Sequence, residues 1–179
     1  MQKSIIAAVR NDREFELALE ANVWVVFDLC PNLMTLAGKT EKAHHAGKKL
    51  YVHMDFAEGI GKDRCGVEFL NKCGVDGIIS TRSALIKLGR EYNLTTVQRF
   101  FVVDSKSVDT TVETVKNSRP DMIEIMPGIV TKVVASLKGI LNMPIICGGL
   151  IDDIKEVDTV LSAGATAIST GKTELWNKA

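Results

Sequence analysis

The sequence predicts a small (β/α)₈ barrel of the TIM type, built as one domain from residues 1–179. Short runs rich in Val and Ile alternate with amphipathic segments along the whole chain, as expected for parallel strands that are buried on both faces. The centres of successive runs lie roughly 20–27 residues apart, about the length of one strand, one helix and two tight loops. The alternative is a doubly wound sheet, but the first run continues as "AAVRND" and lacks the GxGxxG turn of that fold.

Each apolar run marks an expected strand, and each amphipathic segment marks an expected helix. In chain order the strands are SIIAAV (4–9), VWVVFDL (23–29), KLYVHMDF (49–56), DGIIST (76–81), TVQRFFVVDS (96–105), MIEIMPG (122–128), PIICGG (144–149) and TAIST (166–170). The helices between them are Asp12–Glu20, Leu33–Ala46, Gly66–Lys72, Ser83–Tyr92, Val108–Asn117, Ile129–Ile140 and Asp152–Ala163. Only KTELWNKA (172–179) is left for the last helix, so Leu175 and Trp176 would be thinly covered, which makes a homo-oligomer a candidate assembly.

The composition is that of an ordinary globular protein without a global charge. Hydrophobic residues make up 46% and charged residues 25%, and 22 Lys plus Arg balance 22 Asp plus Glu. The surface as a whole therefore does not attract nucleic acid, and any RNA contact needs a local patch. No apolar run approaches the roughly 20 residues that cross a bilayer, and the start of the chain does not read as a secretory signal. We expect a cytoplasmic protein without membrane contact.

The four cysteines do not form a recognisable metal or disulfide pattern. Cys30, Cys65, Cys73 and Cys147 include no CxxC pair, and two of them sit in or at the end of apolar runs, where free Cys behaves as a small hydrophobe. This spacing argues against a zinc site and against a disulfide framework.

Polar residues concentrate where the expected strands end, which is the edge at which barrels place their chemistry. Read in chain order, the strand ends carry Asp28, His53, Asp55, Ser80, Thr81, Asp104, Ser105, Glu124, Pro127, Gly148, Gly149, Ser169, Thr170 and Gly171. A random scatter of polar residues would not place one at nearly every strand terminus.

The last two strands predict a phosphate site. Gly148 and Gly149 let backbone approach a ligand closely, and "STGK" (169–172) adds amide groups at a helix start, where an anion is favoured. The candidate phosphate-binding residues are Gly148, Gly149, Ser169, Thr170, Gly171 and Lys172. The alternative is structural, with glycines that ease a tight turn and a hydroxyl that caps the helix.

Acidic residues at the strand ends allow several kinds of chemistry. Asp28, Asp55, Asp104 and Glu124 could coordinate Mg²⁺, act as acid or base, or accept hydrogen bonds from polyol hydroxyls. Nothing in the pattern requires a metal or another cofactor. Asp104 could instead cap the helix that follows it. Glu124 lies inside an apolar strand, where an unpartnered charge is costly, so we expect it to face inward toward a ligand.

His53 and Asp55 share one face of their expected strand because they are two residues apart. His53 could shuttle a proton or could be a hydrogen-bonded core histidine. We count it with Asp28, Asp55 and Glu124 as the candidate polyol-binding residues. No Lys ends a central strand, so the nucleophile of a Schiff-base aldolase is missing.

Six segments together resemble the glycerol uptake operon antiterminator (GlpP) family. They are VHMDFAEGIGKDRCGVEFL (52–70), DGIISTRSALIKLGR (76–90), VQRFFVVDS (97–105), DMIEIMPGI (121–129), PIICGGLI (144–151) and AISTGKTELW (167–176). A motif such as "GGL" is common among phosphate-binding barrels, but the combination of "DGIIST", "QRFFVVDS" and "IEIMPG" is much more specific.

The resemblance implies a regulator that senses glycerol 3-phosphate and acts on the leader mRNA of a glycerol operon to prevent premature termination. It implies phosphate contacts from Gly148, Gly149, Thr170 and Gly171, and hydroxyl contacts from Asp28, Asp55 and Glu124. It implies no enzymatic activity. The alternative function is a barrel enzyme of the isomerase or lyase type, which would use His53 and Glu124 as acid and base on a small phosphorylated substrate.

The RNA-binding face is weakly marked in the sequence. Readers of RNA sequence usually offer aromatic stacking platforms and a basic stripe, and aromatic residues are only 6% here. Basic residues that could form a local patch are Lys48, Lys49, Lys62, Arg64, Arg82, Lys87 and Arg90. The last three fall along one expected helix, where an ordinary solvated helix face is the alternative.

Overall fold

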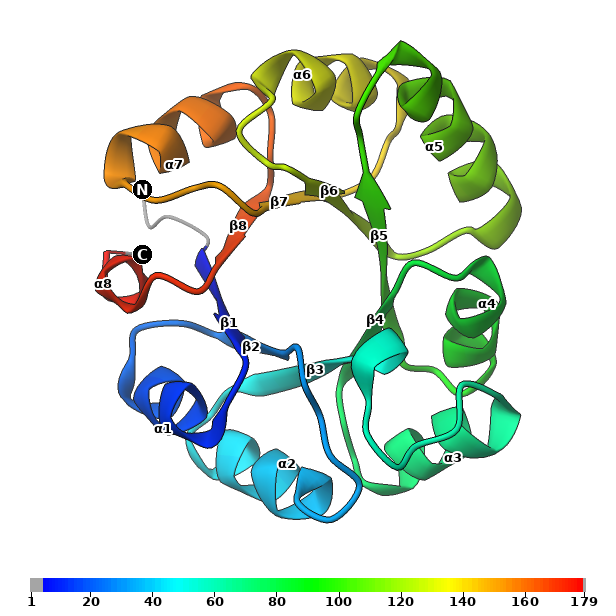
Figure 1. Ribbon diagram of the computed structural model, residues 1–179, viewed down its shortest axis with the longest axis vertical. Coiled ribbons are helices and arrows are strands. Elements are labelled where there is room, and N and C mark those ends of the chain that lie inside the picture. Colours follow the sequence, from blue (N-terminus) through cyan, green and yellow to red (C-terminus); the bar gives the residue numbers. More distant parts are fainter. Residues whose placement is uncertain (1–4, 179) are drawn as a thin grey trace.

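The computed structural model of the chain describes residues 5–178 and confirms the expected barrel (Figure 1). Eight parallel strands pair in chain order, and β8 closes the sheet against β1. The strands are β1 (Ile5–Val9), β2 (Val25–Asp28), β3 (Lys49–His53), β4 (Gly77–Ser80), β5 (Thr95–Phe101), β6 (Met122–Met126), β7 (Ile145–Gly148) and β8 (Ala167–Thr170). Each strand lies inside its expected run, except that β5 begins one residue earlier, and several expected runs extend past the strand into the next loop. Ser4 of the first run falls outside the described residues.

A helix follows every strand and lies outside the barrel (Figure 1). The helices are α1 (Asp12–Glu20), α2 (Leu36–His45), α3 (Arg64–Lys72), α4 (Ser83–Glu91), α5 (Ser105–Ser118), α6 (Thr131–Ile140), α7 (Ile154–Ser162) and α8 (Thr173–Trp176), and a 3₁₀ turn, η1 (Met54–Phe56), precedes α3. Five helices begin two or three residues from the expected position: α3 and α5 begin earlier, and α2, α6 and α7 begin later. Capping decides the starts of α3 and α5, because Asp63 accepts from the amide of Gly66 and Asp104 accepts from the amide of Ser107. The capping alternative for Asp104 is therefore confirmed.

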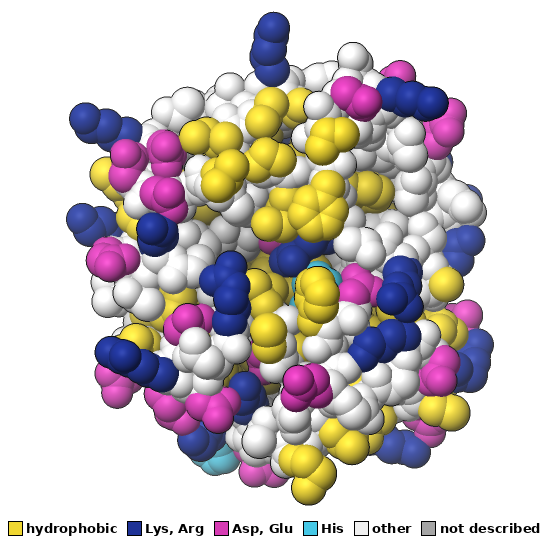
Figure 2. All heavy atoms as spheres, viewed as in Figure 1, with side chains coloured by type: hydrophobic (Ala, Val, Ile, Leu, Met, Phe, Trp, Pro, Cys, Tyr) yellow, Lys and Arg dark blue, Asp and Glu magenta, His cyan; other side chains and the backbone are white. Residues whose placement is uncertain are grey.

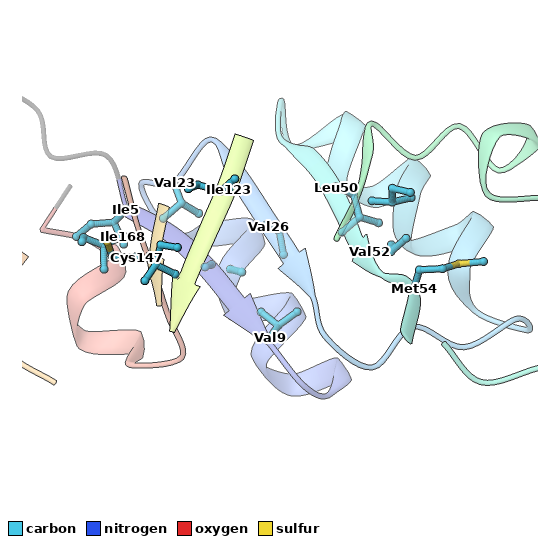
Figure 3. Close-up of a cluster of buried hydrophobic side chains, with 14 of the residues drawn as sticks. Ile5, Val9, Val23, Val26, Leu50, Val52, Met54, Ile123, Cys147 and Ile168 are labelled. Carbon is cyan, nitrogen blue, oxygen red and sulfur yellow. The ribbon is translucent and has the colours of Figure 1, made fainter. Parts of the chain in front are cut away.

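Side chains alternate between two separate hydrophobic clusters along each strand. The cluster shown in Figure 3 lies between the strands and the helices and includes Val26, Val52 and Ile168. The second cluster fills the barrel interior, where Phe27 and Tyr51 stack with their ring centroids 5.7 Å apart. This alternation decides which polar residues at the strand ends face the barrel interior and which face the helix layer.

The short last helix covers the core more completely than the sequence suggested. Leu175 and Trp176 are 4% and 1% exposed, and the Trp176 indole donates a hydrogen bond of 2.8 Å to the carbonyl of Thr170. The expected thin cover, which motivated a homo-oligomer, is therefore wrong for these two residues. No helix within residues 5–178 is both long and apolar enough to cross a membrane.

His53 ends β3 on the same face as Tyr51 and is fully buried at the top of the interior cluster. Its ring lies 4.8 Å, centroid to centroid, from the ring of Phe56. Burial, and after it the positive charge of Arg99, lowers the pKa of the imidazole from its ordinary 6.5 to about 4. The folded chain therefore holds this histidine neutral at pH 7.

This buried histidine predicts a loss of stability in mild acid. Between pH 6.5 and 4 the unfolded chain binds more protons at His53 than the folded chain, so the free energy of unfolding falls as the pH falls. From pH 7 to pH 5, urea unfolding should show a decrease about 2 kcal/mol larger in the wild type than in His53→Leu, which cannot titrate. An equal decrease in the free energy of unfolding of both proteins would contradict the lowered pKa of His53 in the folded chain.

Candidate ligand-binding site

A cavity of 660 Å³ opens at the carboxyl end of the barrel, as expected for this fold. Its walls come from the ends of β1, β2, β5, β6 and β8, the loop after β7, and Phe56 of η1. In Figure 2 this face of the molecule is hollowed near its centre, where hydrophobic and basic side chains meet. The cavity therefore lies at the end of the barrel where the sequence predicts the ligand-binding residues.

The floor of the cavity holds a buried ion pair. The Arg99 Nε donates to Glu124 Oε2 at 2.6 Å, and the Ser169 hydroxyl donates to the other carboxylate oxygen, Oε1, at 2.5 Å. All three residues are at least 90% buried. The pair forms because Arg99 and Glu124 stand directly opposite each other on neighbouring strands and both face inward. The expectation that Glu124 faces inward is confirmed, and its charge is balanced within the protein.

Gly148 makes room for this network. A Cβ at this position would lie 2.4 Å from Ser169 Oγ and 2.7 Å from Glu124 Oε1, so no larger residue fits without displacing them. Gly148 itself does not line the cavity, whereas its neighbour Gly149, with φ of +75°, does. The two glycines therefore differ in role. Gly148 leaves space for the Glu124 carboxylate and the Ser169 hydroxyl, and Gly149 adopts the positive φ with which the chain turns along the rim of the cavity.

The other residues expected to bind phosphate meet on one wall of the cavity. Ser169, Thr170, Gly171 and Lys172 line it together with Gly149. The Thr170 hydroxyl donates to the carbonyl of Ile151 at 3.3 Å and accepts from the amide of Lys172 at 3.1 Å, which fixes the loop after β8 against the loop after β7. The sequence thus placed five of its six candidates around a shared cavity.

Two arginines belong to the site that the sequence analysis did not select. Arg10, the residue after β1, lies so close to Gly171 that a Cβ there would be 2.8 Å from its Nη1. The sequence prediction did not include Arg10, because the strand-end residues it named begin with Asp28, at the end of β2. Arg99 was missed although it is a charge within an apolar strand, which was the signal that identified Glu124. A buried charge of either sign within an apolar strand needs a partner, so the pattern that marks Glu124 also marks Arg99.

The cavity wall carries three cationic side chains, Arg10, Arg99 and Lys172, and two carboxylates, Glu124 and Asp152. Arg99 pairs with Glu124, and Lys172 Nζ lies 3.3 Å from Asp152 Oδ1. Within residues 5–178 the Arg10 guanidinium makes no salt bridge. The rim therefore offers a net positive charge and the floor offers a polar, balanced surface, which together suit a small anion with hydroxyl groups.

Asp28 and Asp55 do not line the cavity. Asp28 has the same orientation as Val26, toward the helices, and its carboxylate lies 3.2 Å from Lys39 Nζ. Asp55 accepts hydrogen bonds from the Ser80 hydroxyl at 2.9 Å and from the Thr81 amide at 2.8 Å. This geometry does not support direct ligand contact by either residue, because both carboxylates already hold the loops that surround the cavity.

His53 also lies outside the cavity wall, beneath Phe56, which belongs to it. The described residues contain no group of three or more His, Cys, Asp and Glu side chains placed to hold a metal ion. The four cysteines are free, and burial raises the pKa of the Cys147 thiol to about 12, so that thiol is inert.

The basic residues proposed for an RNA patch are mostly engaged elsewhere. Lys48 is buried and donates to the carbonyls of Ala21 and Val23 at 2.7 and 2.8 Å, so it is unavailable to RNA. Arg64 pairs with Glu91 at 2.7 Å. Among the remaining candidates, Lys62 donates to the carbonyls of Ala57 and Ile60, Arg82 pairs with Asp55, and Lys87 donates to Asn117. Lys49 and Arg90 are exposed.

The barrel is shared with aldolases, but the likeness in sequence is low. A deoxyribose phosphate aldolase from Aeropyrum pernix matches with a TM-score of 0.74 at 15% identity, covering 98% of this chain and 88% of that one. This similarity concerns the fold alone. Within the eight strands the one lysine is Lys49, at the opposite end of the barrel from the cavity.

Closer relatives match over nearly the whole chain. A crystal structure of a glycerol uptake operon antiterminator regulatory protein from Listeria monocytogenes has a TM-score of 0.92 and 32% identity, with 98% of this chain and 96% of that chain covered. An antiterminator-related protein from Thermotoga maritima has a TM-score of 0.87 and 30% identity, with 98% and 99% covered. The Escherichia coli protein YgcP, described as uncharacterized, is 33% identical and covers 99% of this chain and 94% of its own. The profile of the family described as "Glycerol-3-phosphate responsive antiterminator" matches residues 5–176, and the chain belongs to this family.

Proposed function

We propose that this protein is a cytoplasmic regulator that binds glycerol 3-phosphate in the cavity and, in response, acts on the leader mRNA of a glycerol uptake operon as an antiterminator. The family supports this function, and the observation that carries it is a cavity with a cationic rim and a buried, charge-balanced polar floor. The proposal names no catalytic residue and no metal.

The phosphate would lie at the rim, against the loops after β7 and β8. Gly149, Thr170, Gly171 and Lys172 line this wall, and Arg10 adds a cation that forms no salt bridge with a carboxylate of residues 5–178. A phosphate monoester carries a charge of roughly −1.5 to −2 near neutral pH, so Arg10 and Lys172 both favour it. The start of α7 is a poorer anion site, because Asp153 and Glu156 already form a capping box there.

The hydroxyl groups would lie on the floor. Both oxygens of Glu124 are held by Arg99 and Ser169, and a carboxylate oxygen has a second lone pair with which to accept from a ligand hydroxyl. Gly148 would therefore affect ligand binding by leaving space for Glu124 and Ser169, and not by contacting the phosphate. Asp28 and Asp55 would support the site from behind, by fixing α2 and the loop after β4.

The enzyme alternative has less support in this geometry. A general acid and base must both lie against the substrate, but in this conformation Phe56 packs over His53, which does not line the cavity, and Glu124 is held in an ion pair with Arg99. The lysine nucleophile of the Schiff-base aldolases has no counterpart on the strands at this end of the barrel. Conversion of glycerol 3-phosphate by the purified protein would reverse this preference.

Removal of the unpaired rim cation should weaken phosphate binding. Arg10→Gln is expected to lower the affinity for glycerol 3-phosphate about 10-fold, the loss of one charge-assisted hydrogen bond, and to lower the affinity for inorganic phosphate by a similar factor. Arg13→Gln, a change at an exposed arginine of α1 outside the cavity, is the matched control. Calorimetric titration at fixed ionic strength measures both, and equal affinities in the two variants would exclude Arg10 from the site.

A methyl group at Gly148 should disturb the floor. Gly148→Ala must push Ser169 or Glu124 aside, so the affinity for glycerol 3-phosphate should fall by a factor of about 10 or more while circular dichroism still reports a folded barrel. Gly139→Ala is the control, because a Cβ on that α6 glycine meets nothing within 4 Å. Unchanged ligand affinity in Gly148→Ala would show that the Glu124 network is not part of the binding site.

Ligand and RNA binding should be coupled. A saturating concentration of glycerol 3-phosphate should raise the affinity for labelled leader RNA by a factor of roughly 5 to 150, measured by fluorescence anisotropy, and saturating RNA should raise the ligand affinity by the same factor. Gly148→Ala should keep basal RNA binding and require about 10-fold or more glycerol 3-phosphate for the same response. Equal RNA affinity with and without bound glycerol 3-phosphate would contradict the proposal that this ligand regulates RNA binding.

A further inference from the structure

The imidazole of His53 is buried without a hydrogen-bond partner. Among the side-chain nitrogen and oxygen atoms that are buried within residues 5–178, its two ring nitrogens are the ones left unpartnered. The nearest carboxylate oxygen, Oδ2 of Asp55, is 4.0 Å from Nδ1 and already accepts from Thr81. An unsatisfied buried polar group costs about 1–3 kcal/mol and calls for a functional explanation.

The chemistry of this imidazole suits a hydroxyl group. Burial and the nearby Arg99 guanidinium lower its pKa to about 4, so at neutral pH one ring nitrogen donates and the other accepts. A hydroxyl also both donates and accepts. A phosphate dianion only accepts, and a neutral imidazole offers it one weak donor and no charge, so the anion belongs at the rim.

Phe56 lines the cavity and packs against the His53 ring. The two ring centroids are 4.8 Å apart and the planes are tilted by 30°. Phe56 is nevertheless 65% exposed, so most of its side chain packs against nothing. The backbone beside it is anchored, because Asp55 accepts from Ser80 and Thr81 and Met54 is fully buried. The ring can therefore turn about its own side-chain bonds while the chain stays in place.

We propose that Phe56 is a movable cover and that His53 beneath it is a binding residue of the same site, which hydrogen-bonds a hydroxyl group of the polyol phosphate when the ring turns aside. This rests on the proposed function and adds a second recognition group, on β3, across the barrel from the phosphate wall. Displacement of Phe56 also changes the surface at the cavity mouth when ligand enters.

The test follows the histidine ring nitrogens of the full-length protein by ¹⁵N NMR during titration with glycerol 3-phosphate. His44 and His45, both on α2 and away from the cavity, are internal references. The His53 ring signals should shift in parallel with saturation while the references stay fixed. Propyl phosphate, which keeps the phosphate and lacks both hydroxyls, should bind more weakly and leave the His53 signals unmoved.

Two variants separate the cover from the binding group. Phe56→Ala should raise the pKa of His53 from about 4 toward 6.5 by at least one unit, because burial is the largest cause of its depression. Phe101→Ala removes a phenylalanine of similar exposure, 60%, that does not line the cavity, and should leave this pKa unchanged. His53→Leu should lower the affinity for glycerol 3-phosphate about 10-fold and leave that for propyl phosphate unchanged.

The outcomes distinguish this inference from the function on which it rests. Saturable binding of glycerol 3-phosphate with unmoved His53 signals overturns the inference and leaves the proposed function standing. An unchanged pKa in Phe56→Ala overturns the role of the cover. No binding of glycerol 3-phosphate to the wild-type protein overturns both the inference and the function.

Discussion

The buried ion pair between Arg99 and Glu124 is the constraint around which the top of the barrel is arranged. Neither charge can be buried without the other, because an uncompensated charge in the interior costs several kcal/mol. The pair fixes three other features. Ser169 must satisfy the second carboxylate oxygen, Gly148 must lack a side chain to admit them, and the positive charge of Arg99 adds to burial in lowering the pKa of His53.

This arrangement divides the cavity into two chemically distinct parts. The floor is polar but electrically balanced, which suits groups that donate and accept hydrogen bonds without charge. The rim carries the excess positive charge through Arg10, next to Lys172 and the loop of Gly171. A polyol phosphate has the same division within one small molecule. The shared barrel with aldolases is compatible with a regulator, because the fold supplies the scaffold and the side chains at the strand ends decide the chemistry.

The acidic residues show why strand-end position alone is an incomplete guide to function. Asp28, Asp55, Asp104 and Glu124 all follow the same sequence logic, yet Asp28 pairs with Lys39, Asp55 holds the loop after β4, and Asp104 caps α5. Glu124 alone reaches the cavity. A shift of one residue along a strand reverses the face, so Asp28 turns to the helix layer while Glu124 turns inward.

The sequence by itself determined the barrel, its strand order and most of the cavity wall formed by the loops after β7 and β8. Those features depend on local patterns, namely apolar runs at regular spacing and Gly, Ser and Thr where the last two runs end. Only the tertiary structure decided which polar groups neutralise one another. The partners Arg99 and Glu124 are 25 residues apart, and Glu124 and Ser169 are 45 apart. No local pattern encodes such pairs, because strand register and barrel closure bring them together.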